Sequence, residues 1–586
     1  MATVPRSLLL GAVKISDKIR GWWPDILALA TYAVSAVLLL IHLWRDPGAR
    51  MLADNKQDEI FFEWILTHAG RVITHGDSPF FTEELNAPLG VNLMANTSVL
   101  GLAIPLSPVT LLFGAPVTFA LITTLALAGT AAAWYFVLSR DVVNSKMAAF
   151  VGGLFCGFAP AMISQSTGHP NIAGQFVIPF VIRSVLRLQD GERFVRRGLM
   201  LAALVVYQCF INEELLFLTA LALGVFLLAY LPPRELIPAA KKALPALGVA
   251  VAAAGAVLAY PLYHQFAGAQ AYRGLPEFVL GYSSDLASFT EYSRRSIIGD
   301  AARIDGLGGA TEENTFFGLP LVVLILVAMV WLWRQRVARA VSITALVFTV
   351  LSLGPTLRYR GHDTSWTGPW KLLSSLPLFD SVVPTRLALV VTPLVGVLLA
   401  LFVDRKVMAP SPARFVWVGA LAVALLPLIP TPQPAEPRAG VPTFFTSGQW
   451  RRSLPPEATV VPVPGGWYEY LDAMQWSTAA NLDFRMVGGY FLAPEPGRAD
   501  SRASFGPGYP PTMQLLGNVA STGQVPFVTA EQQSQARADV VYWHATTIVL
   551  PESHGGADAV RQTLDQLYGP GEHVADVWLW DVRSLS

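Results

Sequence analysis

The chain has few charged residues and almost no cysteine. Only 14% of its 586 residues are Asp, Glu, Lys or Arg and 53% are hydrophobic, whereas charged residues make up about a quarter of a typical soluble domain. The formal net charge is +0, and no basic cluster is interleaved with aromatic residues, which argues against a nucleic-acid partner. Cys156 and Cys209 both lie in apolar runs, where packing is a commoner role than a disulfide or a metal site. We therefore expect a membrane protein whose exported parts contain no disulfide.

Motifs of several enzyme classes are missing as well. We find no P-loop, dinucleotide-binding fingerprint, zinc-spacing motif or nucleophile elbow. The N-terminus is unlike a cleavable signal peptide, because its first 20 residues form a weakly amphipathic basic segment that leads directly into a full-length apolar run. We interpret this segment as a cytoplasmic prefix.

Apolar runs dominate the first 430 residues. A membrane-spanning helix needs roughly 17–25 mostly apolar residues, and about eleven runs qualify. They lie near 24–44, 116–138, 147–164, 172–186, 198–212, 214–231, 243–263, 315–333, 339–355, 384–403 and 414–430. A further apolar stretch, Val99 to Phe113, is interpreted as a re-entrant or interfacial segment, because another span there would place the basic residues Arg140 and Lys146 outside.

Basic residues predict the orientation, because the cytoplasmic loops of membrane proteins carry an excess of Lys and Arg. With about eleven spans, every basic loop falls on one side. The residues of these loops are Arg140, Lys146, Arg187, Arg193, Arg196, Arg197, Arg234, Lys241, Lys242, Arg334, Arg336, Arg339, Arg405, Lys406 and Arg414. We therefore predict a multi-pass protein of the plasma membrane with a cytoplasmic N-terminus and an exported C-terminal part.

The composition changes after Pro430, where a proline-rich joint begins. The apolar runs beyond this joint are too short to cross a membrane. Those typical of strands lie at 460–463, 540–543 and 574–580, and one typical of a helix lies at 556–568. The predicted fold class is an α-helical polytopic membrane protein over residues 1–430, followed by an extracytoplasmic α/β or α+β domain over residues 431–586.

Three outward loops are long, at about 46–97, 264–314 and 356–383, and loops of such length are often functional. The first of them places Asp58 and Glu59 among aromatic residues. Apolar neighbours raise a carboxyl pKa toward the working range of a general base, which makes these two acids candidate catalytic residues. The ordinary alternative for acids in a loop is solvation or helix capping.

The order of these features resembles the C-type glycosyltransferases. A first span precedes a large outward loop that opens with Asp58-Glu59 and closes with the stretch Asn86 to Leu93, and further spans and an exported domain follow. The likeness covers roughly residues 20–405 and is greatest to the actinobacterial arabinofuranosyltransferases and mannosyltransferases of cell-envelope assembly. Members of this superfamily move a sugar from a polyprenyl-phosphate donor to an acceptor on the outer side of the membrane.

The resemblance implies a catalytic residue and a set of partners. An acid of the first outward loop is the usual catalytic base in this fold, and by position that role falls on Asp58. The implied partners are membrane lipid, a polyprenyl-phosphate sugar donor, and a glycan, glycolipid or protein acceptor of the cell envelope. The implied transfer inverts the anomeric centre and needs no nucleotide on the outer side.

A polyprenyl-phosphate donor needs a cation for its phosphate, and arginine supplies paired N–H donors in one plane. Arg386 is the first candidate, because Val382-Val383-Pro384-Thr385-Arg386 opens the tenth span at its outer end. His169, in a turn at the outer end of the third span, and Arg294 and Arg295 in the second long loop are further candidates. Arginines at membrane surfaces also extend to lipid headgroups, and backbone groups alone can satisfy a histidine in a turn.

Two further candidate sites complete the set. Glu213 and Glu214 lie in an outward turn at or below the membrane surface, where acids are costly and where oxygen ligands suit Mg²⁺, Mn²⁺ or Ca²⁺. Capping of the helical hairpin, or pairing with an arginine, is the alternative. In the exported domain, Trp467 and Tyr468 follow two glycines and are candidates for stacking on a glycan acceptor, although such glycines more often form a simple turn.

Two other functions agree with parts of the sequence. A transporter or flippase for a lipid-linked saccharide would use Glu213, Glu214 and His169 as a coupling or substrate site. A non-catalytic scaffold of envelope assembly would keep the same fold. We favour the glycosyltransferase, because the sequence has no internal repeat and because three long outward loops and a folded exported domain exceed what alternating access needs.

Topology reporters test the predicted orientation. Reporters fused after Arg140, Arg197, Arg234 and Arg339 should read cytoplasmic, and a reporter at the C-terminus should read exported, because of the positive-inside bias. An exported signal after Arg197, or a cytoplasmic C-terminus, would overturn the predicted number of spans.

Overall fold

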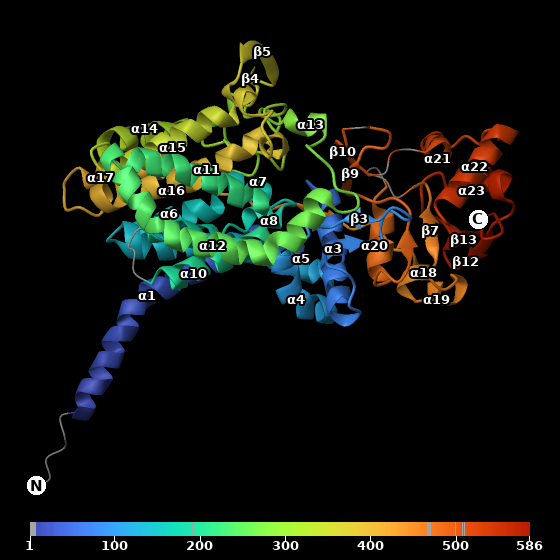
Figure 1. Ribbon diagram of the computed structural model, residues 1–586, viewed down its shortest axis with the longest axis horizontal. Helices are drawn as coiled ribbons and strands as arrows, with labels where there is room; N and C mark the ends of the chain where they lie inside the picture. The colour runs from blue at the N-terminus through green and yellow to red at the C-terminus, as the bar shows by residue number, and fades with distance from the viewer. Residues whose placement is uncertain are drawn as a thin grey trace, which may run out of the picture.

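The computed structural model describes residues 7–188, 193–465, 470–498, 500–506, 508 and 510–585. These residues form a helical body and a region with a β-sheet, which lie next to each other along the long axis of the molecule (Figure 1). Helix α1 projects from the helical body at the end away from the sheet (Figure 1).

The helices of the body vary widely in length. They are α1 (Ser7–Leu39), α2 (Ile41–Trp44), α3 (Lys56–Thr74), α4 (Leu100–Phe113), α5 (Ala115–Val137), α6 (Lys146–Phe158), α7 (Pro160–Gln165), α8 (Pro170–Ala173), α9 (Ile178–Leu186), α10 (Phe194–Cys209), α11 (Glu213–Tyr230), α12 (Pro233–Ala267), α13 (Glu277–Leu280), α14 (Leu319–Leu332), α15 (Arg336–Ser352), α16 (Ala388–Phe402) and α17 (Arg414–Leu425). Short hairpins accompany them: β2 (Phe81–Thr82) with β3 (Val91–Asn92), and β4 (Thr356–Tyr359) with β5 (His362–Thr367).

Among the described residues, 6 helical segments are long and apolar enough to cross a membrane. They are Trp22–Leu39, Ala115–Val142, Lys146–Gln165, Glu213–Tyr230, Pro233–Ala267 and Pro384–Val407. Shorter apolar helical segments lie at Leu100–Phe113, Pro170–Leu186, Leu319–Leu332 and Arg414–Leu428. A helical membrane protein is therefore confirmed, whereas the count of about eleven spans and their orientation stay predictions.

Proline begins three helical segments that surround the site described below. Pro160 opens α7, Pro170 opens α8, and Pro384 opens a 3-10 turn (Pro384–Leu387) that leads into α16. Proline suits the first turn of a helix, because its missing N–H would have no partner there in any case. These breaks leave irregular backbone between helices, which membrane proteins tolerate where it is buried in protein or lines a cavity.

The first long loop is helical where it carries the two candidate acids. Asp58 and Glu59 lie in the first turn of α3, and every residue from Glu59 to Gly70 is buried. The cause is packing: α3 contacts α4 and α5 of the body and α20 of the C-terminal region, and aromatic residues such as Trp64 fill the core between them. The expectation of a loop around Asp58 and Glu59 is therefore wrong.

The C-terminal region contains a five-stranded mixed sheet with the strand order β12-β13-β11-β7-β8. Its strands are β7 (Thr459–Pro462), β8 (Arg485–Met486), β11 (Thr547–Pro551), β12 (Glu572–Val574) and β13 (Val577–Asp581). Strand β7 runs parallel to β8 and β11, whereas β13 runs antiparallel to β11 and β12. The helices of this region are α18 (Thr443–Thr446), α19 (Trp450–Ser453), α20 (Asp472–Ala479), α21 (Pro511–Thr522), α22 (Ala530–Tyr542) and α23 (Ala557–Tyr568). Apolar residues of α21, α22 and α23 form one core with the sheet.

The sheet region confirms two of the predicted C-terminal elements, the strand at 460–463 and the helix at 556–568. The single strand predicted at 574–580 is instead the end of β12, a turn at 575–576 and most of β13, which pairs antiparallel with β12. The predicted strand at 540–543 is wrong, because residues 540–542 are the last residues of helix α22 and Trp543 caps its C-terminal end. A capping box formed by Thr529 and Gln532 starts this helix, and Val540 is buried while the two residues after it face solvent. This one-sided exposure is typical of a helix.

Two small sheets and a buried charge cluster complete the C-terminal region and its joint. Strand β9 (Leu492–Pro494) pairs with β10 (Ala503–Phe505), and β1 (Arg50–Leu52) pairs with β6 (Ala435–Pro437) across the joint. Arg438, the residue after β6, donates hydrogen bonds at 2.8 Å to Glu59 Oε1 and Glu63 Oε2 on α3. The side chains of all three residues are at most 8% exposed. This clasp ties the outer region to α3.

The clasp places Glu59 and Glu63 in an unusual electrostatic environment. Burial raises the pKa of Glu59 to about 8, the negative charge of Glu63 adds to the rise, and Arg438 opposes it. Burial raises the pKa of Glu63 as well. The folded protein therefore binds more protons at this cluster than the unfolded chain does, so the cluster favours folding less as the pH rises between about 4.5 and about 8.

Replacing the arginine of the clasp should destabilise the protein strongly. Arg438→Met should lower the free energy of unfolding by about 3–5 kcal/mol, because it leaves two buried carboxylates without their cation. The loss should grow as the pH rises, since these carboxylates then have to ionise without a partner. Thermal unfolding in detergent at acidic and mildly basic pH measures both effects. Arg451→Met is the control, because the Arg451 side chain is 60% exposed; equal losses in the two variants would contradict the role of the clasp.

Candidate functional site

A chain of hydrogen-bonded polar side chains links the helical body to the C-terminal region. Its members, in order, are Tyr490, Asp58, His169, Gln165, Glu312, Arg386 and Glu214. They come from segments that are far apart in sequence: Tyr490 and Asp58 alone are 432 positions apart. The fold therefore assembles this site from most of the chain.

Asp58 lies near one end of the hydrogen-bonded chain. Its Oδ1 accepts a hydrogen bond from the Tyr490 hydroxyl at 2.8 Å, and its Oδ2 accepts one from the Asn55 amide at 2.6 Å. The same Oδ2 lies 2.8 Å from Nε2 of His169. The Asp58 side chain is 16% exposed, so part of it is accessible to a small group.

Opposing effects act on the pKa of Asp58. Burial raises the pKa, but the positive charge of His169 and the hydrogen bonds from His169, Asn55 and Tyr490 outweigh burial and hold it below its usual range. The expectation that apolar neighbours raise this pKa is therefore wrong. The polar partners keep Asp58 a carboxylate at neutral pH, which is the form that can accept a proton.

Gln165 and Glu312 form the middle of the hydrogen-bonded chain. Gln165 Oε1 lies 2.8 Å from His169 Nδ1, and its Nε2 donates to Glu312 Oε2 at 3.1 Å and to Asn314 Oδ1 at 3.0 Å. Gln165 and Asn314 are both 0% exposed. Buried polar groups that are all paired in this way make a rigid arrangement, since any rearrangement leaves one of them without a partner.

Arg386 and Glu214 form the other end. Arg386 donates from Nε and Nη2 to Glu312 Oε1, at 2.9 and 2.7 Å, and from Nη1 to Glu214 Oε2 at 2.9 Å. The second oxygen of Glu214, Oε1, is buried and has no hydrogen-bond partner within the described ranges. Because one guanidinium faces two carboxylates, this end has a surplus of negative charge and one acceptor atom that is still unsatisfied.

Glu59, the second predicted catalytic acid, does not belong to this arrangement. It binds Arg438 and accepts a hydrogen bond from the backbone N–H of Leu52 at 2.7 Å. Adjacent residues of a helix point in different directions, and here Glu59 faces Arg438 whereas Asp58 faces His169 and Tyr490. The structure therefore places Glu59 outside the hydrogen-bonded chain, and its predicted catalytic role stays untested.

Arg294 and Arg295, the reserve phosphate-binding candidates, are bound to carboxylates of their own. Arg294 pairs with Glu313, and Arg295 pairs with Asp54. Their side chains are 20% and 22% exposed. The structure places them outside the hydrogen-bonded chain that connects Asp58 with Arg386, and their predicted role stays untested.

The remaining candidates differ in how far the structure describes them. Glu214 joins the hydrogen-bonded chain, whereas Glu213 does not. Over the described part of the chain, no group of three or more His, Cys, Asp and Glu side chains is arranged to hold a metal ion, and a divalent metal stays a prediction. Trp467 and Tyr468, the predicted acceptor-binding residues, lie outside the described residues.

Sequence reasoning did not identify several members of the site. Glu312 and Asn314 belong to an acidic and amide run directly before an apolar span, the same signal that selected Glu213 and Glu214. Gln165 directly follows the apolar run 147–164 and opens the polar stretch that contains His169, so its position next to a candidate residue was the available signal. Tyr490 carries no such signal, because only the fold brings it to Asp58.

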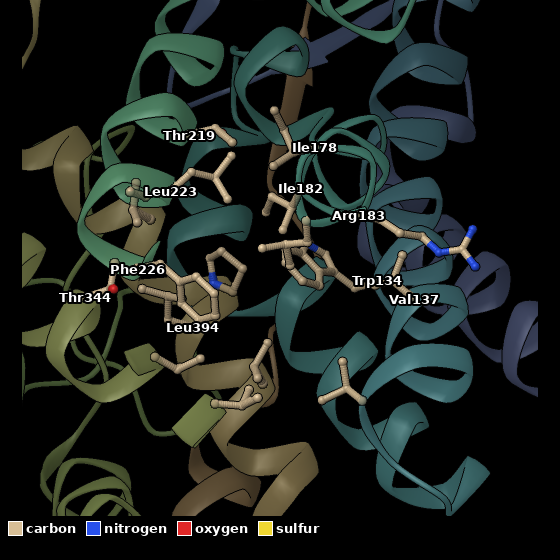
Figure 2. Close-up of a pocket in the computed structure, with 18 of the residues that line it drawn as sticks. Trp134, Val137, Ile178, Ile182, Arg183, Thr219, Leu223, Phe226, Thr344 and Leu394 are labelled. Atoms are coloured by element: carbon tan, nitrogen blue, oxygen red, sulfur yellow. The ribbon is translucent and has the colours of Figure 1, made fainter. Parts of the chain in front are cut away.

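An apolar groove lies inside the membrane part, with a volume of about 500 Å³. Helices α5, α9, α11, α15 and α16 line it. Figure 2 shows side chains of α11 facing those of α5 and α9 across the groove; the labelled residues are Trp134, Val137, Ile178, Ile182, Arg183, Thr219, Leu223, Phe226, Thr344 and Leu394. Its lining is mainly aliphatic and aromatic, as expected of a site for an apolar chain.

The two ends of this groove differ in character. At one end it includes Leu215 and Leu389, which follow Glu214 and Arg386 closely in the sequence. At the other end it includes Asp141, which pairs with Arg183 and Arg187. The groove therefore extends from the Arg386 end of the hydrogen-bonded chain toward residues predicted to lie on the cytoplasmic side.

The arrangement of helices and sheet is similar to that of solved glycosyltransferases. The arabinofuranosyltransferase AftD from Mycobacteria aligns with a TM-score of 0.58 and 12% identity over 96% of this chain and 40% of that chain. A mutant form of the same enzyme aligns with a TM-score of 0.55 and 13% identity over 96% of this chain and 41% of that one. This chain thus spans less than half the length of the mycobacterial enzyme. The predicted C-type glycosyltransferase fold is confirmed.

A further solved structure and a family model also match. The oligosaccharyltransferase AglB from Archaeoglobus fulgidus, in complex with an inhibitory peptide and a dolichol-phosphate, aligns with a TM-score of 0.48 and 13% identity over 91% of this chain and 70% of that chain. A family model described as "Domain of unknown function (DUF6311)" matches residues 75–427. No curated protein sequence matches the chain. His169, Glu312 and Arg386 lie inside the range of the family model, and Asp58 precedes it.

Proposed function

This chain belongs to the DUF6311 family. We propose that it is a membrane glycosyltransferase that moves a sugar from a polyprenyl-phosphate donor to a cell-envelope acceptor on the outer face of the membrane. The observation that carries the proposal is the hydrogen-bonded chain from Asp58 to Arg386. It joins a partly exposed carboxylate to a guanidinium next to an apolar groove. The fold it shares with an arabinofuranosyltransferase supports the same class of reaction.

Asp58 is the proposed general base. The acceptor hydroxyl approaches its accessible edge, and the carboxylate takes the hydroxyl proton as the acceptor oxygen bonds to the anomeric carbon of the donor. The bond from that carbon to the donor phosphate oxygen breaks in the same step, and the anomeric centre inverts. The low pKa of Asp58 keeps it ionised before the reaction. Proton transfer then occurs late, when the bonding oxygen has become acidic.

Arg386 is the proposed ligand of the donor phosphate. A guanidinium has five N–H donors, and the hydrogen bonds to Glu312 and Glu214 use three of them. The remaining two can bind phosphate oxygens and stabilise the departing polyprenyl phosphate. The apolar groove would hold the first isoprene units of the lipid, since its lining is apolar and includes Leu389, which follows Arg386 by three residues.

The charges at Arg386 support a divalent metal as a second ligand of the phosphate. Two carboxylates outweigh the single guanidinium, so an anionic donor would be repelled unless another cation accompanied it. Glu214 Oε1 is buried and unsatisfied, and it suits Mg²⁺, Mn²⁺ or Ca²⁺. Magnesium often binds one or two carboxylates together with substrate phosphates and water, so a cage of three protein ligands is not required. Such a metal would neutralise phosphate charge.

Removing divalent cations tests this part of the proposal. EDTA should lower sugar transfer by at least about 10-fold, because the negative surplus at Arg386 then opposes donor binding. Adding Mg²⁺ or Mn²⁺ in excess should restore transfer, and Glu214→Gln should weaken the response to added metal. Transfer that proceeds at full rate in EDTA would contradict the metal while leaving the roles of Asp58 and Arg386 open to their own tests.

Replacing Asp58 tests the proposed base. Asp58→Asn should lower transfer by about 10²–10⁴-fold, because the amide keeps the shape of the side chain but cannot take the acceptor proton. Membranes containing the protein are incubated with radiolabelled polyprenyl-phosphate sugars, one sugar at a time, and transfer to an envelope acceptor is measured. Thermal unfolding checks that the variant is folded.

Asp77→Asn is the matched control, since Asp77 binds Arg71 on the same helix as Asp58 but outside the hydrogen-bonded chain. Its transfer should equal the parental rate. Sugar transfer at the parental rate by Asp58→Asn would contradict the assignment of Asp58 as the base. A parental protein that transfers no sugar, but moves a lipid-linked saccharide across liposome membranes, would favour the transporter.

Replacing Arg386 tests the proposed phosphate site. Arg386→Lys keeps the charge but loses the paired N–H geometry, so the KM for the lipid donor should rise by about 10-fold, and Arg386→Ala should raise it further. Because Arg386→Ala leaves Glu312 and Glu214 without their cation, its folded fraction is measured by thermal unfolding. Arg358→Lys is the control, because Arg358 lies in hairpin β4–β5. Unchanged donor KM in Arg386→Lys and Arg386→Ala would assign Arg386 to structure alone.

A further inference from the structure

The side-chain amide of Gln165 has one orientation that satisfies its neighbours. Its Nε2 lies 3.1 Å from Glu312 Oε2 and 3.0 Å from Asn314 Oδ1. Asn314 donates from its own Nδ2 to the same Glu312 oxygen at 2.8 Å, which leaves Asn314 Oδ1 as an acceptor. Two acceptors need a donor opposite them, so the oxygen of the Gln165 amide must face His169.

This orientation decides which nitrogen of His169 carries a proton. Nδ1 lies 2.8 Å from the oxygen of Gln165, an acceptor, and must therefore be protonated. A neutral imidazole has a single N–H, so Nε2 would then be bare, yet it lies 2.8 Å from Asp58 Oδ2. Two lone pairs repel at this distance unless a proton lies between them. His169 and Asp58 therefore share one proton.

We infer that Gln165 is a positioning residue that holds His169 in this state, and that the proposed base is a His169–Asp58 pair sharing one proton rather than Asp58 alone. The positioning role rests on the proposed function, whereas the location of the protons does not. Glu312 binds Gln165 through one oxygen and Arg386 through the other. The same carboxylate therefore aligns the base and the phosphate-binding arginine.

The charges along the hydrogen-bonded chain favour this assignment. Its ionisable groups are Tyr490, Asp58, His169, Glu312, Arg386 and Glu214. Three of them are carboxylates and one is a guanidinium, so a positive imidazole brings their sum closer to zero. Although burial raises the pKa of Asp58, the charge of His169 is foremost among the effects that lower it.

Removing the amide should release the histidine. Gln165→Met keeps the size of the side chain but offers no acceptor to Nδ1. His169 can then place its single proton on Nε2 and donate to Asp58 as a neutral ring. Asp58 keeps the hydrogen bond but loses the neighbouring positive charge, and its pKa rises.

Nitrogen-15 NMR of the full-length protein in lipid bilayers measures the state of the ring directly. The chain has 9 histidines, and the spectrum of His169→Asn identifies the signals of His169. At about pH 7, the parental protein should show both ring nitrogens of His169 protonated, and Gln165→Met should show a protonated Nε2 and a bare Nδ1. A parental ring with a bare Nδ1, or an unchanged ring in Gln165→Met, would overturn the inference.

Gln208→Met is the matched control. Gln208 is also buried, and it donates to the backbone carbonyl of Asn212, outside the hydrogen-bonded chain. The His169 signals of this variant should equal those of the parental protein. The same change in both glutamine variants would assign the effect to general loosening of the fold and would contradict the role of Gln165.

The pH profile of sugar transfer tests the positioning role. Gln165→Met should lower kcat by about 10-fold with little change in the donor KM, and the rising limb of its profile should move to higher pH, because the pKa of Asp58 rises. A lower kcat in Gln165→Met, with the rising limb of the pH profile at its parental position, would assign Gln165 a merely structural part and would overturn its positioning role. If the parental protein transfers no sugar, the proposed function fails, and the NMR spectra still decide the location of the protons.

Discussion

The carboxylate of Glu312 is the interaction on which the rest of the site depends. One of its oxygens accepts two hydrogen bonds from Arg386, and the other accepts hydrogen bonds from Gln165 and Asn314. Its side chain is only 6% exposed, and in such surroundings paired groups interact strongly whereas unpaired ones are costly. A single side chain therefore fixes the guanidinium directly and the imidazole of His169 through Gln165. The separation between base and phosphate-binding group follows from this constraint.

Asp58 is held from the outer side as well. The Arg438 clasp secures α3 at Glu59 and Glu63, and Tyr490 binds Asp58 itself. Apolar residues of α3 share one buried core with residues of the C-terminal region, so packing is continuous across the predicted boundary at residue 430. The outer region is thus a structural part of the site, and a change in its position would move the proposed base.

The sequence could predict those helices, strands and candidate residues that a local pattern of neighbouring residues indicates. The long apolar helices, strand β7 and helix α23 each show in the periodicity of their own residues. Asp58 was selected through its aromatic neighbours and the resemblance to C-type glycosyltransferases, and Arg386 and His169 through their positions at the outer ends of apolar runs. The features that the sequence did not predict depend on tertiary packing. Nothing in its neighbours indicates that Glu59 turns toward an arginine 379 positions away, or that α3 is buried by a region beyond the joint. The pKa of Asp58 was predicted in the wrong direction for the same reason, since two of its three polar partners, His169 and Tyr490, come from other segments.

A cryo-EM structure of the protein in lipid nanodiscs with farnesyl phosphate and Mg²⁺ tests the central claim most directly. The account predicts phosphate density within hydrogen-bond distance of Arg386 and beside Glu214, with the isoprene chain in the groove between α9, α11 and α16. Phosphate bound instead at Arg294, Arg295 or the Arg183–Arg187 end of the groove, with Arg386 still bound only to Glu312 and Glu214, would contradict it.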